Sequence, residues 1–335
     1  MKIKQIYIIT QLNKQRFVKF YKYFYFLLII NKSVCYNYNG DAMKDILKIS
    51  FMICLVIVVF IFKDNISNFI MDNIIYRGSN KVLTYNEYYL DYDYRYVQNL
   101  DTSDVKNYQE VLNMFYTILN SGDNSYSFYC NYENCVNDIK KLISDDNIIS
   151  NINNFVHPFN SFDSINIDIA NSGKITIKNK KAYNDEEIEY IKTYINTFIN
   201  ENIKEEMTNY DKIKIFHDHI VNNTRYDKDN VEDTYTAYNL LTAGIAICGG
   251  YSDIMSIYLN TLGIQNYKIT SENHIWNLVN LDNTWYHLDM TWDDPVANDG
   301  NQYLIHNFFL ISTNELHNLD KVEHNFDINV YLEAR

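Results

Sequence analysis

The sequence has few of the residues that break regular structure, and fewer positive than negative charges. Its 335 residues include only 9 glycines and 2 prolines, whereas Asn, Ile, Lys and Tyr are abundant. This bias indicates an AT-rich genome as much as a structural demand, so the tyrosine excess carries little functional weight. Asp and Glu number 42 against 29 Lys and Arg, which gives a net charge of −13. Because nucleic-acid binding needs basic surface, this balance argues against it.

Apolar residues are not scarce, since the chain is 47% hydrophobic and 16% aromatic. That composition argues against disorder, and the length suffices for a short N-terminal appendage and one or two domains with proper cores. The charge is unevenly distributed. Nine Lys and Arg stand against two Asp before residue 49, so that part carries +7 and the remainder carries −13 − 7 = −20.

A long stretch without charge separates these two parts, within "ILKISFMICLVIVVFIFK" (46–63). This stretch has three readings: a cleaved signal peptide, an uncleaved membrane anchor or a buried core helix. The stretch has no polar face, which argues against a core helix, and no Ala-x-Ala motif follows it, which argues against cleavage. We therefore predict a transmembrane signal-anchor at 46–63, with the basic residues 1–45 in the cytoplasm and the acidic body outside. Residues 1–42 could instead be a mis-assigned start, with initiation at Met43.

The five cysteines offer no obvious framework of paired thiols or metal ligands. Cys35 lies within residues 1–42, the segment before Met43. Cys54 lies in the predicted anchor and lacks the small residues that precede a lipidation site. Cys130 and Cys135 could form a local disulfide or remain free, and their spacing decides neither. Cys248 stands alone in the C-terminal half, which is a reason to look for chemistry there.

Hydrophobic periodicity predicts several elements and no internal repeat. We expect a helix between Val105 and Gly122, a hairpin at 165–177 with its turn at 171–173, and a helix that starts with a capping box of Asn184 and Glu187. Another helix is expected from Tyr210.

Two histidines of that last helix, His217 and His219, suggest a metal site. Positions two apart on a helix face different directions, and neither paired cysteines nor an HExxH motif accompanies them. We therefore expect no metal site and no cofactor.

The stretch "GIAICGGYSDIMSIYLNTLGI" (244–264) places Cys248 at the predicted start of a helix that ends at Gly263. Unpaired N–H groups and the dipole at a helix N-terminus favour a thiolate, and Gly249 and Gly250 allow another chain to approach the sulfur closely. A small buried thiol at a loop-to-helix junction is an equally good reading of this stretch alone.

The following stretch, "NHIWNLVNLDNTWYHLDMTWDDP", predicts two strands joined by a tight turn at Asp282 and Asn283. A two-residue turn pairs Leu281 with Thr284. This register makes His274 a diagonal neighbour of Asp289 on one face of the sheet, within reach of a hydrogen bond. A thiol, a histidine and an aspartate in this order have the parts of a nucleophile, a base and an orienting group.

These segments, with "KIKIFHDHIVNNTRYD" before them, resemble the transglutaminase-like superfamily, particularly its bacterial exported members, over about residues 208–312. The resemblance implies an α+β fold with a papain-like core, in which a helix bearing the nucleophile packs on an antiparallel sheet. It also implies a triad of Cys248, His274 and Asp289.

Neighbouring residues allow more than one reading. Trp276 and Tyr251 could line the substrate groove, although an ordinary core tryptophan is equally consistent with position 276. Asp293 and Asp294 fit the capping of a turn better than catalysis, and His287 is a rival base on the same face. For the oxyanion hole, the N–H of Cys248 is one donor, and the sequence does not choose between Tyr226 and Tyr238 for a second.

We therefore expect a membrane-anchored, extracytoplasmic thiol enzyme that acts on peptide or side-chain amides through a thioester. Hydrolysis is slightly preferred to amine transfer, and the alternatives are a cross-linking transglutaminase and a silent binding module. The expected partners are a protein or peptide substrate, with cell-envelope peptides as a candidate class, and the membrane through 46–63. The catalytic domain is predicted at 204–315, after an α+β region of unknown role at 64–203 and before a C-terminal tail at 316–335.

Overall fold

The computed structural model describes residues 52–53, 56–57, 83–101, 104–170, 173–228, 234–296 and 303–335. The predicted N-terminal segment 1–45 and all but four residues of the predicted anchor 46–63 lie outside these ranges. Within these ranges, no helix combines the length and the apolar character needed to cross a bilayer. The chain divides into two units, residues 1–80 with 166–174 and residues 81–165 with 175–335, and the candidate site lies in the second.

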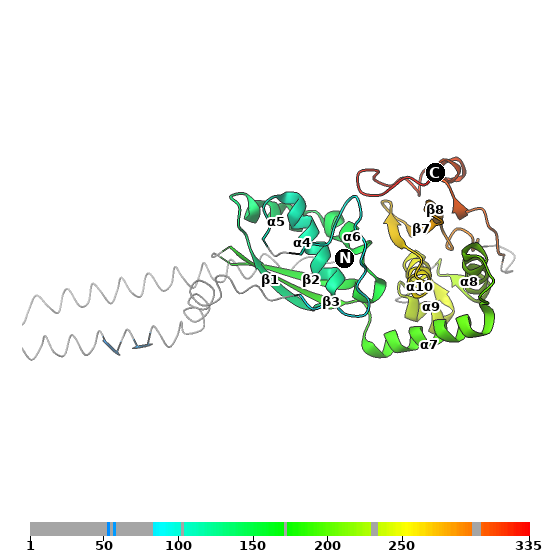
Figure 1. Cartoon of the computed structure of the whole chain (residues 1–335), viewed down its shortest axis with the longest axis horizontal. Coiled ribbons are helices and arrows are strands. Elements are labelled where there is room, and N and C mark those ends of the chain that lie inside the picture. The colour runs from blue at the N-terminus through cyan, green and yellow to red at the C-terminus, as the bar shows by residue number, and fades with distance from the viewer. Residues whose placement is uncertain are drawn as a thin grey trace, which may run out of the picture. The chain divides into compact units, whose positions relative to one another are not determined.

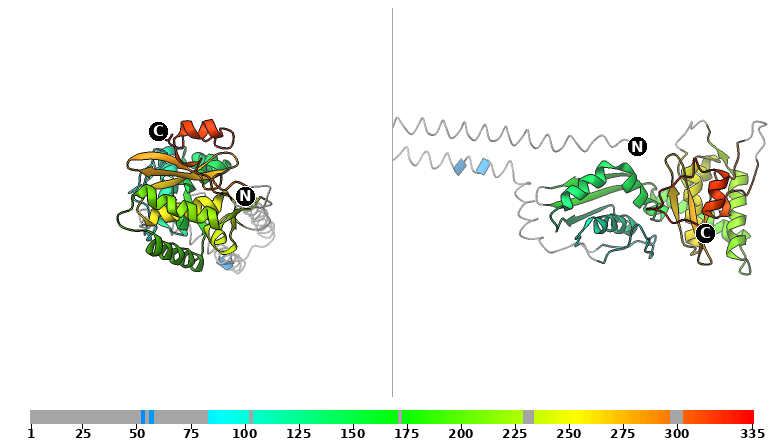
Figure 2. Two further views of the ribbon diagram at one scale, coloured as in Figure 1. Left: turned by 90° about the vertical axis from the view of Figure 1, so that its right-hand side faces the viewer. Right: turned by 90° about the horizontal axis from the view of Figure 1, so that it is seen from above.

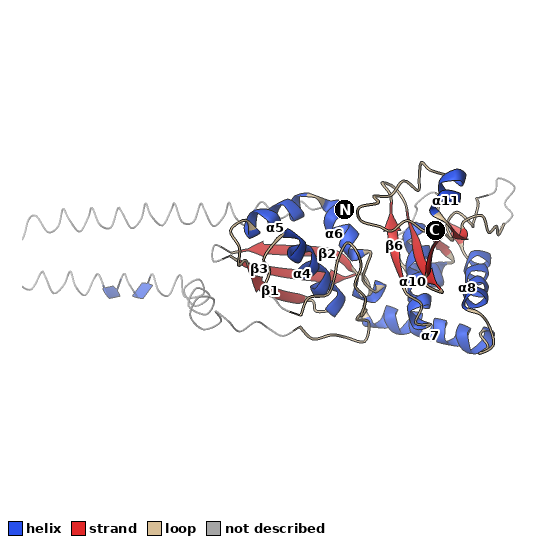
Figure 3. Cartoon of the chain, turned by 45° about the horizontal axis from the view of Figure 1, so that its top comes forward, coloured by secondary structure: helices blue, strands red, loops and turns tan. Residues whose placement is uncertain are grey.

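Residues 83–181 form an α+β region around a three-stranded sheet, in which the order of strands is β1-β3-β2. Helices α4, α5 and α6 contact one another beside these strands (Figures 1 and 3). A disulfide joins Cys130 to Cys135, which decides a pairing that the spacing left open. The elements are α4 (Tyr108–Ser121), β1 (Ser125–Tyr129), α5 (Cys135–Ser144), α6 (Asp146–Asn153), the 3-10 turn η2 (Pro158–Asn160), β2 (Phe162–Ile169) and β3 (Lys174–Lys181).

Helix α4 confirms the helix predicted between Val105 and Gly122. The side chain of Asn107 accepts a hydrogen bond from the N–H of Glu110 and caps its start. Gly122 ends it with a φ of 79°, a conformation that glycine adopts without strain. Every residue from Val111 to Ser121 is buried, so α4 is the central helix of this region.

Residues 182–335 form a second α+β arrangement around the antiparallel sheet β6-β7-β8-β9. Figure 2 shows α10 and α11 on opposite sides of this sheet, and α10 contacts β6 and β7 while α11 contacts β8. The predicted α+β class, with a helix on an antiparallel sheet, is therefore confirmed. The elements are α7 (Asp185–Asn202), α8 (Asn209–Asn223), β4 (Arg225–Tyr226), α9 (Ala237–Ala243), β5 (Ile245–Ala246), α10 (Cys248–Thr261), β6 (Asn266–Thr270), β7 (Ile275–Leu281), β8 (Thr284–Leu288), β9 (Phe309–Ile311) and α11 (Thr313–Leu319).

The starts of α7 and α8 follow from their sequences. The side chain of Asn184 accepts hydrogen bonds from the N–H groups of Glu186 and Glu187, and the Glu187 carboxylate accepts the N–H of Asn184, as the predicted capping box requires. Thr208 and Asp211 form the same reciprocal pair at the start of α8. Both helices thus begin where short polar side chains satisfy the first free N–H groups.

The hairpin of β7 and β8 has the predicted register. Leu281 pairs with Thr284, and the ladder continues to the pair of Asn277 and Leu288. Asp282 and Asn283 both have positive φ, 53° and 66°, as a two-residue turn of type I′ demands. The turn therefore fixes which side chains of the two strands share a face.

Helix α10 is the core of the second arrangement, and residues from Gly250 to Leu259 are buried on all its sides. The ring of Tyr258 stacks on Phe216 of α8 with centroids 3.9 Å apart. Full burial of a large apolar side chain contributes about 1.5–3 kcal/mol. Strong packing around α10 therefore fixes the position of its first residue, Cys248.

The segment predicted as a C-terminal tail, 316–335, packs on this body. Thr313 donates its N–H to the carbonyl of Ala334, and the N–H of Ala334 donates to the Thr313 hydroxyl. Tyr331 is buried, and its hydroxyl bonds to the side chains of Asn151 and Thr270. Side chains of this segment thereby come close to the sheet.

Candidate active site

Cys248 is the first residue of α10, as the sequence predicted, and is the free cysteine of the described chain. Its side chain is half-buried. The two glycines after it are needed for close packing: a Cβ at Gly249 would lie 2.8 Å from the carbonyl oxygen of Tyr235, and one at Gly250 would lie 3.0 Å from Ala246 Cβ. The glycines thus let the start of α10 press against the segment before α9.

His274 and Asp289 lie at the ends of neighbouring strands and are joined by a hydrogen bond. His274 immediately precedes β7, Asp289 immediately follows β8, and His274 Nε2 lies 2.5 Å from Asp289 Oδ2. Because Nε2 is held by the carboxylate, Nδ1 is the nitrogen that can serve the thiol. The Cys248 side chain is a hydrogen-bond partner of His274. The structure thus brings the three residues of the predicted triad together.

The charges of this group support one another. Burial disfavours a charged imidazole, but the Asp289 carboxylate and the Cys248 side chain outweigh it and raise the pKa of His274 to about 10. Burial also opposes ionisation of Asp289, yet the charge and hydrogen bonds of His274 and His324 hold the pKa of Asp289 well below its usual value. The site therefore favours a His274 imidazolium beside the Asp289 carboxylate.

Trp276 and Tyr251, the predicted substrate-binding residues, are each 1% exposed. The Trp276 ring stacks on His274 with centroids 5.4 Å apart, and its Nε1 donates to His287 Nδ1 at 3.0 Å. The Tyr251 hydroxyl donates to Asp294 Oδ2 at 2.5 Å. In this structure both rings support the site from within, and neither presents a face to a substrate.

His287, the rival base, lies in the core and away from the thiol chemistry. Its Nδ1 accepts from Trp276 and its Nε2 bonds to the Thr313 hydroxyl at 2.8 Å. Burial lowers the pKa of His287 to about 3, so it is neutral. With both nitrogens engaged elsewhere, His287 is not the partner of Asp289.

The aspartates of the "WDDP" segment have structural roles, as their sequence context suggested. Asp293 accepts the N–H of Phe308 at 2.9 Å and faces His217 Nε2 at 3.1 Å. Asp294 accepts the Tyr251 hydroxyl. Both carboxylates therefore anchor the loop that follows Asp289.

Tyr226 is the better placed of the two tyrosines left open as oxyanion donors. After burial, the charge of Cys248 is the largest cause that raises the pKa of Tyr226, so its hydroxyl lies in the field of the sulfur. Tyr238 instead packs edge-on against Tyr190 of α7, with centroids 5.4 Å apart. A hydroxyl that keeps its proton beside the thiol is a suitable donor to a developing oxyanion.

His324 was missed by sequence reasoning, although it also bonds to the triad carboxylate. Its Nε2 lies 3.0 Å from Asp289 Oδ2, and its Nδ1 lies 2.9 Å from Asp320 Oδ2. No motif marks it, because it lies 35 residues beyond Asp289 in a segment without a strand pattern. A histidine in the mostly polar segment "LDKVEHNF" is the one sequence signal that could have drawn attention to it.

Two groups of side chains among the described residues have metal-ligand chemistry. One is His274, Asp289 and His324, and the other is His217, Asp218 and His306. Zinc bonds of 2.0–2.2 Å in a tetrahedron hold ligand atoms roughly 3.3 Å apart. The N···O distances of 2.5 and 3.0 Å around Asp289 are shorter and are those of direct hydrogen bonds. The first group therefore fits a proton network better than an ion.

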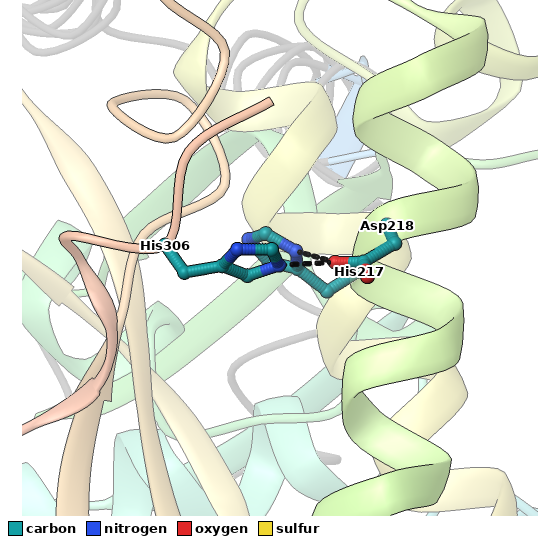
Figure 4. Close-up of side chains that lie close together, drawn as sticks. All are labelled: His217, Asp218 and His306. Carbon is teal, nitrogen blue, oxygen red and sulfur yellow. Dashed lines mark hydrogen bonds and ion pairs between the residues drawn. The ribbon is translucent and has the colours of Figure 1, made fainter. Parts of the chain in front are cut away.

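The second group, shown in Figure 4, links α8 to the segment before β9. Asp218 Oδ1 lies 2.9 Å from His217 Nδ1 and 2.6 Å from His306 Nε2. The ammonium of Lys214 lies 2.5 Å from Asp218 Oδ2 and 3.1 Å from His306 Nε2, so a cation already faces these ligands. His219 bonds instead to the Tyr194 hydroxyl at 2.6 Å, which agrees with the expectation that the two histidines of α8 do not act together.

Residues 197–290 match a family model described as the Transglutaminase-like superfamily. A solved structure of a TGase is similar at 20% identity and a TM-score of 0.24, over 43% of this chain and 47% of that one. A protein from Cytophaga hutchinsonii, proposed to be a cysteine protease, is similar at 13% identity and a TM-score of 0.26, over 42% of this chain and 65% of that one. The chain thus spans less than two thirds of either protein, and no curated protein matches it. Residues 197–290 form a domain of the transglutaminase-like superfamily, which includes both proteases and transglutaminases.

Proposed function

We propose that this protein is a thiol hydrolase that cleaves peptide or side-chain amides through a thioester on Cys248. The observation that carries the proposal is the position of His274, which bonds to Asp289 through Nε2 and also has the Cys248 side chain as a hydrogen-bond partner. This is the arrangement that activates a thiol and holds its proton for a leaving group.

The proposed reaction uses only side chains and N–H groups of the site together with water. The Cys248 thiolate attacks the amide carbonyl, and the oxygen develops a negative charge that the N–H groups at the start of α10 and the Tyr226 hydroxyl can stabilise. The tetrahedral intermediate collapses as the C–N bond breaks, and the His274 imidazolium gives its proton to the departing amine. Neutral His274 then takes a proton from water as the water oxygen attacks the thioester. The acid product leaves, and the thiolate and imidazolium are restored.

The burial of Trp276 and Tyr251 supports hydrolysis over amine transfer. Transfer needs a surface that holds an acceptor amine and excludes water, and an exposed aromatic wall at these two rings would supply one. Both are fully packed inside the domain. Water is then the more accessible acceptor, and cross-linking remains the rival outcome of the test.

We also propose that the domain works outside the cytoplasm, anchored through residues 46–63. The apolar stretch and the lysines before it support this topology. The disulfide of Cys130 and Cys135 adds an independent argument, because structural disulfides persist in oxidising compartments. Peptides of the cell envelope are then the substrates within reach.

The test incubates the full chain with a glutamine-containing protein and a labelled primary amine. We expect amide cleavage and a transient acyl adduct on Cys248, detected by mass spectrometry, without stable incorporation of the amine. Cys248→Ala should lose at least about 10³-fold in rate and keep its melting temperature. Cys248-dependent incorporation would establish transfer instead, and neither product nor adduct would favour the binding module.

A further inference from the structure

His324 connects the triad carboxylate to a second carboxylate. Its side chain is 0% exposed, and it comes from the segment that follows α11. Its Nε2 approaches the same oxygen, Asp289 Oδ2, that His274 holds, and its Nδ1 approaches Asp320 Oδ2. The four side chains therefore form one chain of hydrogen bonds: His274, Asp289, His324 and Asp320.

Both ring nitrogens of His324 face carboxylates. Burial alone would raise the pKa of either aspartate, but hydrogen bonds and opposite charge outweigh it, so the pKa values of both Asp289 and Asp320 are lowered. Ionised carboxylates only accept hydrogen bonds. Two ionised carboxylates on the two ring nitrogens are the partners that a doubly protonated imidazolium would have.

The surroundings of His324 stabilise such a charge. Its ring stacks on Phe308, with centroids 5.4 Å apart, and meets the rings of Trp276 at 4.9 Å and Trp292 at 5.1 Å. Aromatic rings attract a cation within about 6 Å of their centroids. A buried charge that is paired twice and enclosed by aromatic rings avoids most of the cost of leaving water.

We propose that His324 is a positioning residue of the triad, which carries a positive charge. It orients the Asp289 carboxylate and weakens the stabilisation that this carboxylate gives to the His274 imidazolium, while Asp320 holds the other ring nitrogen of His324. The proposal rests on the thiol function proposed above. The other titratable groups that face His324 are His274, at a centroid distance of 5.3 Å, and His287, which is neutral.

The sign of the effect follows from charge. When the positive charge near His274 is lost, the negative charge of Asp289 stabilises the His274 imidazolium more strongly. The imidazolium therefore persists to higher pH. The Cys248 thiolate loses the same nearby positive charge and needs higher pH to form. We therefore expect both ionisations to move upward by about one pH unit, a free-energy change of about 1.4 kcal/mol.

His324→Gln tests this, because a Gln amide can still donate to Asp289 but carries no charge. On the full chain, the pH dependence of Cys248 alkylation by iodoacetamide and the NMR titration of His274 should both shift up by about one unit. Alkylation on the acid side should then fall about tenfold. Asp320→Asn, at a partly exposed site, should shift both in the same direction by less.

Asp327→Asn is the matched control, since Asp327 lies in the same segment and its carboxylate accepts a hydrogen bond from the N–H of Asn329. It should shift neither titration. Unchanged titrations in folded His324→Gln and Asp320→Asn, even with lower melting temperatures, would make His324 a structural residue and overturn the proposal. The readout is ionisation and not turnover. A protein that cleaves no amide but shows the shifts would contradict the proposed function alone.

Discussion

Four hydrogen bonds meet at the carboxylate of Asp289. His274 and His324 bond to Oδ2, and the N–H groups of Thr291 and Trp292 donate to Oδ1 at 2.9 and 3.3 Å. Both oxygens are thus fixed in a side chain that is 1% exposed. A carboxylate held at this many points keeps the imidazole of His274 in one orientation.

Asp289→Asn should lower the turnover rate by roughly 10²–10⁴-fold, because the amide neither holds the His274 tautomer nor stabilises its charge. His274→Ala should be at least as severe. Rates of amide cleavage with a model peptide measure both. A loss in His287→Ala greater than that in His274→Ala would show that the wrong histidine had been assigned as the base.

The same Asp289→Asn variant has a defined dependence of stability on pH. The pKa of His274 is raised from 6.5 to about 10, so the pair stabilises the fold fully below pH 6.5 and loses this contribution as pH rises through about 10. Breaking a buried pair costs about 3–5 kcal/mol. Unfolding by denaturant should show a deficit of that order at pH 6, shrinking toward pH 10, and a deficit constant with pH would contradict the pairing.

Sequence reasoning could assign a residue where its position depends on nearby residues, as at the start of a helix or beside a tight turn. Cys248 begins a helix with a clear apolar stripe, and the turn at Asp282 and Asn283 sets the register that brings His274 to Asp289. His324 obeys no such rule, because its approach depends on how the segment after α11 packs. The burial of Trp276 on β7 was also not predictable, because strand alternation gives the face of the sheet and not how deeply that face is covered. For Tyr251 on α10, helical periodicity has the same limit.

At the scale of elements, the start of α10 is the least tolerant point. Gly249→Ala would put a Cβ 2.8 Å from a backbone oxygen of Tyr235, so the helix or that segment must shift. We expect a loss of about 1–3 kcal/mol in unfolding free energy and a marked fall in the alkylation rate of Cys248.

Gly263→Ala is the control for this variant. Gly263 has a φ of 70° and open space around it, so alanine there costs about 1–2 kcal/mol in backbone strain. The thiol should react at its normal rate. An unchanged rate in Gly249→Ala would show that the close approach at residue 249 does not set the position of the sulfur.

At the scale of the whole molecule, residues 83–181 were the least predictable. The sequence indicated a helix and a hairpin there, and both are present, but the sheet order β1-β3-β2 joins strands that are not consecutive. Such pairing depends on contacts distant in sequence, which periodicity does not report. The spacing of Cys130 and Cys135 did not decide their disulfide for another reason: two cysteines five residues apart can pair or remain free.

The proposed topology predicts the result of protease shaving. Protease added to intact cells should remove the acidic body and leave an N-terminal stub in the membrane, because only the segment before residue 64 is shielded. Immunoblotting with antibodies to each part measures this. A full-length chain protected until the cells are lysed would contradict an extracytoplasmic domain.

The hairpin of β7 and β8 also has a consequence for how the site assembles. His274 and Asp289 are 15 residues apart and are joined through a two-residue turn, so little chain entropy is lost when they meet. Local contacts of this kind form early in folding, whereas the contact of His324 with Asp289 must close a loop of 35 residues. His274 and Asp289 can therefore meet in a partly folded chain, whereas their contact with His324 forms only when the segment after α11 docks.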